Sequence, residues 1–239
     1  MGIDSSTTRV ALQRVATHVL ARARFLEAGR FGLRVLPGGF GTPMFGADEV
    51  ILRVSGTALV REWRSEDGSR SEAMALQGAT LRDVGAFAHV DLDVPFSAGH
   101  DTAPLGDLEE PMSFDEEVAE SLAEWLRVGV QAIDLSVAAL GSVSAPSVLQ
   151  VWPEHFDAAI DVATASGRCN VGVSVGDSFC AEPYVYVGPW GDERPGGDAV
   201  WNAPFGAFRP ASSLVGDGRA VGSVCQFLDS TLALLRVTP

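Results

Sequence analysis

Residues 148–190, VLQVWPEHFDAAIDVATASGRCNVGVSVGDSFCAEPYVYVGPW, decide the fold because short apolar segments alternate there with turn residues. They include both tyrosines of the chain, two of its five tryptophans and the triplet His155-Phe156-Asp157. The glycines and aspartate of GVSVGDS, and the glycine-rich GPWGDERPGG that begins at the end of the stretch, are typical of turns. Short apolar segments between turns predict strands, so we expect a β-sheet core here.

Alternation in the first part of this stretch predicts a polar pair. Alternate residues of a strand share a face, so Trp152 and Glu154 lie on one face and His155 and Asp157 on the other. A carboxylate two residues from an imidazole can fix its tautomer and raise its basicity, or can share a cation with it. His155 and Asp157 are therefore the first candidates for a functional site.

The segment around the two tyrosines predicts a second strand. Glu182, Tyr184 and Tyr186 alternate and would share one face. Pro183 has no amide hydrogen, which favours an edge or the start of a strand. The tyrosines and Trp190 could supply the apolar walls that a ligand pocket needs around a few polar groups.

The composition is that of a folded chain. It has 239 residues, 46% of them hydrophobic and 20% charged, which suffices for one large domain or two small ones. We expect a cytoplasmic protein without membrane association, because no apolar run approaches the ~20 residues of a membrane helix and the N-terminus lacks a secretory-signal pattern. Cys169, Cys180 and Cys225 show no C-x-x-C spacing, which argues against a disulfide framework and a structural zinc site.

The charges exclude several classes of function. There are 31 acidic and 17 basic residues, a net charge of −14, and every basic residue is arginine. The absence of lysine excludes Schiff-base chemistry, pyridoxal-phosphate enzymes and the lysine of a phosphate-binding loop, and we expect no cofactor. The negative balance argues against nucleic-acid binding. Residues 1–64 hold nine arginines against five acidic residues, which predicts a basic N-terminal element docked on an acidic body.

Four segments show helical periodicity or capping signals. In the longest, Ser113 and Glu116 have the spacing of a capping box, and Gly129 marks close packing or a bend. His18, in the first segment, is expected at the surface or at its boundary. The four predicted helices are residues 5–28, a short segment after Thr80, residues 113–140 and residues 219–236.

The strands between these helices predict β-meanders. FGLRVLP, EVILRVSG and TALVREWR have strand character, and SGT between the last two suggests a hairpin. We interpret GGFG as a turn and SEDGSRS as a solvent loop. The predicted fold is α+β, with mainly antiparallel sheets packed against a long central helix and terminal helices. We expect a single domain over residues 1–239, whose halves 1–112 and 113–239 have similar layouts without a sequence repeat.

The segment AHVDLDVPFSAGHDTAPLG concentrates ionisable groups. His89, Asp91 and Asp93 would face one way, and the loop after them carries His100 beside Asp101. These residues either contribute to a site or form a solvated acidic edge with a histidine in a turn.

WPEHFDAAID, EPYVYVGPW and GHDTAPLG together resemble uncharacterised proteins of high-GC bacteria, and the resemblance spans most of the chain. More distantly, FDAAIDV, PYVYVGPW, WNAPFGAF and FLDST resemble the C-terminal half of a bacterial domain of unknown function. Neither resemblance implies an activity, a cofactor or a catalytic residue.

The first functional hypothesis is a small-molecule-binding protein with a His/carboxylate pocket, whose enzymatic form would be a water-dependent acid/base enzyme. His155 would be the general base, Asp157 would orient it, and a carboxylic acid such as Glu154 would supply the proton. The sequence leaves open whether the protein is an enzyme. The candidate ligand-binding residues are His100, Asp101, Trp152, Glu182, Tyr184, Tyr186 and Trp190.

Two further interpretations use the same residues. A metal could be held by His100, His155 and Asp157, with Glu154 if the strand is bulged, and such ligands suit Zn, Mn or Fe. An H-x-D pair is weak evidence on its own, so we assign no metal. Alternatively, His155, Asp157 and Glu182 satisfy one another or solvent on a structural sheet.

The alternative class of function is a non-catalytic interaction module or a homodimeric structural protein. Its partner surface would be formed by the aromatic and proline-rich segments EPYVYVGPW and WNAPF, because aromatic residues are enriched at the centres of contacts. A homodimer formed through an exposed sheet edge is the natural case.

Overall fold

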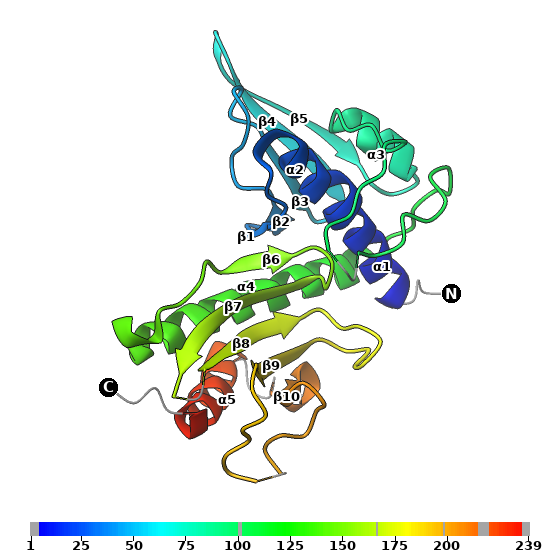
Figure 1. The fold of residues 1–239 in the computed structure, drawn as a ribbon. Coiled ribbons are helices and arrows are strands. Elements are labelled where there is room, and N and C mark those ends of the chain that lie inside the picture. The colour runs from blue at the N-terminus through cyan, green and yellow to red at the C-terminus, as the bar shows by residue number, and fades with distance from the viewer. Residues whose placement is uncertain (1–4, 100–101, 166, 198, 215–219, 236–239) are drawn as a thin grey trace. The chain divides into compact units, whose positions relative to one another are not determined.

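The fold is described from a computed structural model and is α+β, as predicted, with two antiparallel five-stranded sheets and helices (Figure 1). By contacts the chain divides into two compact units, Met1–Glu124 with Val151–Phe156, and Trp125–Gln150 with Asp157–Pro239. The structure describes residues 5–99, 102–165, 167–197, 199–214 and 220–235.

The first unit begins with one continuous helical segment over the predicted residues 5–28. It consists of α1 (Ser5–Val15), the π-helix η1 (Ala16–Ala21) and α2 (Arg22–Ala28). The segment ends at Gly29, which adopts φ +64° as a left-handed C-terminal cap. The π-helical turn in the middle was not predicted, since hydrophobic periodicity does not distinguish it from an α-helix.

The sheet of the first unit is a meander in chain order. The hairpin predicted at SGT is present, with Ser55 opposite Ala58. Two predictions were wrong, because GGFG contains a strand and most of SEDGSRS joins another, which leaves only Glu66 and Asp67 as the turn. The strands are β1 (Arg34–Leu36), β2 (Gly39–Gly41), β3 (Ile51–Ser55), β4 (Ala58–Ser65) and β5 (Gly68–Ala75).

A short helix, α3 (Leu81–Phe87), follows this sheet. The predicted capping signal is confirmed as a complete capping box, since the Thr80 side chain accepts from the Asp83 amide and the Asp83 carboxylate accepts from the Thr80 amide. The Thr80 hydroxyl also donates to the Asp83 carboxylate at 2.7 Å, and this bond, together with the one from the Thr80 amide, lowers the pKa of Asp83.

The second unit is built on the long helix α4 (Glu116–Leu140), whose first turns belong to the first unit. Ser113 is not its cap, because the Asp115 carboxylate accepts from the Val118 amide one turn into the helix. A Cβ atom at Gly129 would collide with the Val173 side chain of the sheet. Gly129 therefore marks close packing, one of the two roles expected for it.

The second sheet is again a meander, in the order β10-β9-β8-β7-β6. The C-terminal helix α5 (Ala220–Leu235) contacts α4, where the Cys225 thiol donates to the Ala132 carbonyl at 3.7 Å. The strands are β6 (Gln150–Trp152), β7 (Asp157–Thr164), β8 (Gly167–Ser174), β9 (Tyr184–Pro189) and β10 (Ala207–Pro210).

In chain order, the stretches before and after residue 112 share one order of elements. Each has a helix, five antiparallel strands in chain order, and then a second helix. Among the described residues, no helix combines the length and apolar character needed to cross a bilayer.

Candidate functional site

The strand expected to carry both His155 and Asp157 is interrupted. β6 ends at Trp152, residues 153–156 form a turn, and β7 begins at Asp157. Phe156 adopts φ +52°, which breaks the alternation that a continuous strand would need. His155 is exposed in the turn, whereas Asp157 is 6% exposed on β7. The prediction that a shared strand face joins these two residues was wrong.

The turn is anchored to the N-terminal helical segment of the first unit. The Thr17 hydroxyl donates to the Pro153 carbonyl at 2.8 Å, and the Gln13 side chain donates to the Glu154 carbonyl at 2.9 Å. Trp152 is half-buried at the end of β6. Trp152 and Glu154 are thus held on a rigid backbone, a requirement for any role in binding.

One stripe of this helical segment also holds the acid-rich segment of residues 90–107. Arg14, His18 and Arg22 follow one another at intervals of four residues, and each hydrogen-bonds to backbone carbonyl oxygens of that segment. The expectation of a surface position for His18 was wrong, since the residue is 3% exposed. The acceptors are Leu105 and Asp107 for Arg14, Ala103 for His18, and Leu92 and Val94 for Arg22.

Burial sets the protonation of His18. Desolvation lowers the pKa of the imidazole and outweighs the backbone hydrogen bonds at Ala103 and Pro104, which raise it. The charges of Arg14 and Arg22 lower the pKa further. A neutral imidazole can still donate its Nε2 hydrogen to the Ala103 carbonyl at 2.7 Å. His18 therefore acts here as a neutral donor that fixes the chain around Ala103.

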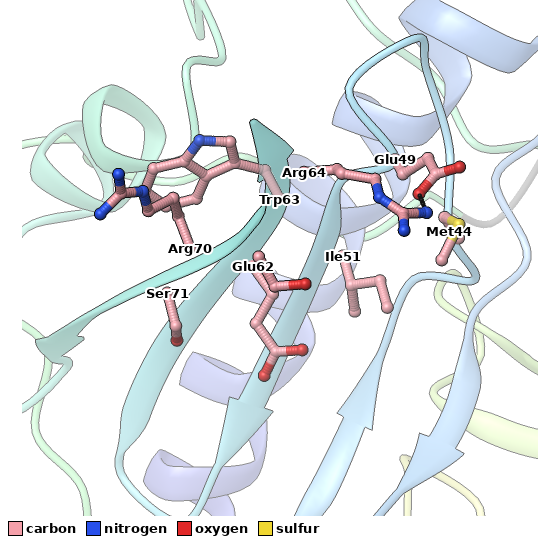
Figure 2. A pocket seen from close by; sticks show the side chains of 9 residues that line it. Met44, Glu49, Ile51, Glu62, Trp63, Arg64, Arg70 and Ser71 are labelled. Carbon is pink, nitrogen blue, oxygen red and sulfur yellow. Dashed lines mark hydrogen bonds and ion pairs between the residues drawn. The ribbon is translucent and has the colours of Figure 1, made fainter. Parts of the chain in front are cut away.

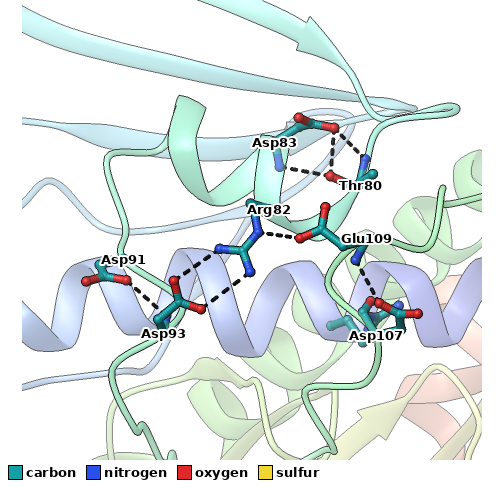
Figure 3. A network of polar contacts seen from close by, with 8 residues as sticks. Thr80, Arg82, Asp83, Asp91, Asp93, Asp107 and Glu109 are labelled. Carbon is teal, nitrogen blue, oxygen red and sulfur yellow. Dashed lines mark hydrogen bonds and ion pairs between the residues drawn. The ribbon is translucent and has the colours of Figure 1, made fainter.

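The acid-rich segment itself is braced by Arg82 of α3 (Figure 3). Arg82 pairs with Asp93 at 3.2 Å and also with Glu109. The expected alternation of His89, Asp91 and Asp93 with Val90, Leu92 and Val94 holds only in part. Val90 and Leu92 are buried and the three polar residues are exposed, but Val94 is also exposed and no strand forms there. The predicted residues His100 and Asp101 lie outside the described residues.

In the second unit, Asp157 meets a tyrosine rather than a strand neighbour. The Tyr186 hydroxyl donates to its carboxylate, and the Tyr184 hydroxyl donates to Asp177 at 2.6 Å. Gly172 makes room for this arrangement, since a Cβ atom there would lie 2.6 Å from the Tyr186 ring. Burial raises the pKa of both tyrosines, and the charge of the nearby aspartate adds to the effect.

These tyrosines belong to a packed aromatic cluster. The contacting rings have centroid separations between 5.0 and 6.3 Å, mostly in edge-on geometry, which stabilises the sheet. Glu182 precedes β9 and accepts from the Ser212 amide, and Trp190 is 61% exposed beyond its end. The cluster consists of Phe179, Tyr184, Tyr186, Phe205 and Phe208.

A different part of the first unit is hollowed. A cavity of about 340 Å³ lies over β3, β4 and β5 (Figure 2). Arg64 pairs with Glu49 at 2.8 Å at one end, and Arg70 lies beside Trp63 at the other. The lining residues are Met44, Glu49, Ile51, Glu62, Trp63, Arg64, Ser69, Arg70 and Ser71.

Sequence reasoning missed this hollow. Three of its residues, Ser69, Arg70 and Ser71, belong to the segment interpreted as a loop. The sequence did hold one sign of it. The strand predicted at TALVREWR ends with a tryptophan between charged residues, Glu62, Trp63 and Arg64, and these three residues line the hollow.

No family model, curated protein or solved structure was found to match the chain. Among the described residues, no group of three His, Cys, Asp or Glu side chains is placed to hold a metal ion. Of the proposed ligand set His100, His155, Asp157 and Glu154, the first lies outside the described part of the chain.

Proposed function

We propose that this chain is a small-molecule-binding protein whose ligand occupies the hollow over β3, β4 and β5. The supporting observation is the concavity itself, because about 340 Å³ falls within the range of small-ligand sites. Met44, Ile51 and Trp63 provide apolar surface, and Arg64 and Arg70 provide donors. A few charged groups around an apolar floor are the usual composition of such a site.

Glu62 of the lining is paired with Arg53 at 2.9 Å, so the two arginines of the lining favour an anionic ligand with an apolar body. The side chains of Arg64 and Arg70 are 69% and 53% exposed, so both guanidinium groups remain accessible. Their partners Glu49 and Asp67 form surface ion pairs, which contribute about 0–1 kcal/mol and are readily exchanged. A carboxylate can accept two parallel hydrogen bonds from arginine. An aromatic or branched carboxylic acid fits this chemistry.

We propose that the protein binds a ligand in the hollow, and we assign no reaction to it. The residues that line the hollow include neither a histidine nor a cysteine, and the candidate base His155 lies in the turn after β6. The Tyr186–Asp157 pair is a second candidate location, favoured by its buried carboxylate. Both locations can be tested with the same ligand.

The test is a fragment screen by ligand-observed NMR, using aromatic carboxylic acids and their methyl esters as matched controls. We expect acids to bind and esters to bind at least ~10-fold more weakly, which corresponds to about 1.4 kcal/mol. Arg64→Gln and Arg70→Gln should each weaken binding, whereas Arg34→Gln, exposed on β1 of the same sheet, should not.

Two results would overturn the location. Either no acid binds, or binding survives in both hollow variants and is lost in Tyr186→Phe, which would move the site to the second unit.

A further inference from the structure

β5 is an edge strand with an unpaired side. It pairs with β4 over its whole length and ends the sheet order β1-β2-β3-β4-β5. Seven of its eight residues are exposed. Within the described ranges, no other segment hydrogen-bonds to the backbone on its outer side. Such an edge is a template for another strand unless the chain blocks it.

The hydrogen-bond pattern identifies which residues face outward. The Arg64 amide donates to Asp48 on the other side of β4, and the Leu76 amide donates to Thr57, the residue before β4. Because antiparallel residues alternate between bonded and non-bonded pairs, Arg70 and Glu72 direct their backbone groups to β4. The outer edge is therefore formed by the backbone groups of Ser69, Ser71 and Ala73.

The charges on this strand are self-complementary in one register. If two copies pair antiparallel about a two-fold axis at Ser71, Arg70 of each copy lies opposite Glu72 of the other. Shifting the axis to Arg70 places two arginines opposite each other, and shifting it to Glu72 places two glutamates there. Opposite charges across an antiparallel pair are favourable and like charges unfavourable.

We propose that the chain forms a two-fold homodimer by antiparallel pairing of β5 with β5 of a second copy, centred on Ser71. Arg70 and Glu72 now form surface ion pairs with Asp67 at 3.1 Å and with Arg61 at 3.2 Å. Pairs of this kind are weak, so the two side chains can also engage the second copy. A two-fold axis gives the same patch to both partners, as in most homodimers.

The dimer does not require the proposed ligand, but Arg70 serves both, so a residue outside the hollow is needed to test them separately. Ser69, Arg70 and Ser71 line the hollow, but Glu72 does not. A substitution at Glu72 therefore tests dimerisation without altering the lining of the hollow.

The experiment is sedimentation equilibrium of the full chain from about 1 to 300 μM, a range that captures weak dimers. Wild type should dimerise. Arg70→Glu alone and Glu72→Arg alone place like charges opposite each other and should each raise the dissociation constant at least ~10-fold. An equimolar mixture of these two variants restores both opposite-charge pairs, so it should dimerise within ~3-fold of wild type.

Two controls separate the interface from folding. Ser71→Pro removes an outward amide hydrogen at an edge position where proline is tolerated, so it should abolish dimerisation while thermal unfolding shows a folded chain. Glu120→Arg, exposed on α4, changes the net charge by the same amount and sign as Glu72→Arg and should have no effect on dimerisation. A monomeric wild type at the highest concentration would overturn the proposal. The proposal would also be overturned if neither charge reversal changed the dissociation constant of the dimer, or if the mixture of the two variants stayed monomeric.

Discussion

At His18, burial and two neighbouring guanidinium groups lower the pKa of the imidazole below its ordinary value of 6.5. The unfolded chain then binds a proton more readily than the folded protein, so the free energy of unfolding falls as the pH drops below about 6.5. Each unit of pKa difference is worth about 1.4 kcal/mol. His18→Gln should flatten this dependence, because its amide donates without titrating. Urea unfolding at about pH 5 and about pH 7.5 measures it.

The matched control for this prediction is Thr17→Val, because it removes a buried hydrogen bond of the same helical segment, to the Pro153 carbonyl, without removing a titratable group. It should leave the dependence below about pH 6.5 as steep as in wild type. Equal slopes for His18→Gln and wild type would show that His18 does not couple folding to pH.

Tyr186 and Tyr184 test what a hydroxyl contributes to a buried carboxylate. Tyr186→Phe removes the donor to Asp157, which is almost fully buried, and should lower the free energy of unfolding by about 1.5–3 kcal/mol. Tyr184→Phe should cost less, because Asp177 is more exposed and also accepts from two backbone amides. Chemical denaturation of both variants makes the comparison, and equal losses would contradict it.

Among the contacts between elements, Gly129 lets α4 pack closely against Val173 of β8. Gly129→Ala gains about 1 kcal/mol of helix propensity, but its methyl group would collide with Val173. Overpacking costs about 1–3 kcal/mol or more, so we expect a net loss of stability. Gly222→Ala in α5 is the control, because nothing lies within 4 Å of its Cβ position and only the propensity gain remains. Thermal unfolding should shift in opposite directions for the two variants.

Some elements could be predicted from the sequence and others could not. The helices were found because burial of one face imposes a 3.6-residue period and because signals such as the Thr80–Asp83 capping box are local. β5 was missed because an exposed edge strand has no buried face to impose alternation. The turn at residues 153–156 was missed because it depends on Phe156 at positive φ, where an aromatic residue gives no local signal.

The candidate site could be predicted less well than the fold. Asp157, Tyr184 and Tyr186 were named, and they do lie in one cluster. Their partner Asp177 comes from a loop whose path is set by the sheet, and the hollow joins three separate segments around Trp63. Contacts between residues distant in the sequence need a known topology, which local patterns do not contain.

For the whole molecule, the net charge of −14 dominates the response to salt. Self-repulsion of like charges destabilises a compact state, and salt screens it. Salt also weakens surface ion pairs such as Arg82 with Asp93, but each contributes only about 0–1 kcal/mol. At neutral pH the melting temperature should therefore rise by about 2–4 °C, roughly 1 kcal/mol, between ~10 mM and ~300 mM NaCl. Near pH 4.6, where the net charge vanishes, calorimetry should show no rise or a small fall. A melting temperature that falls with salt at neutral pH would mean that specific ion pairs outweigh the net repulsion.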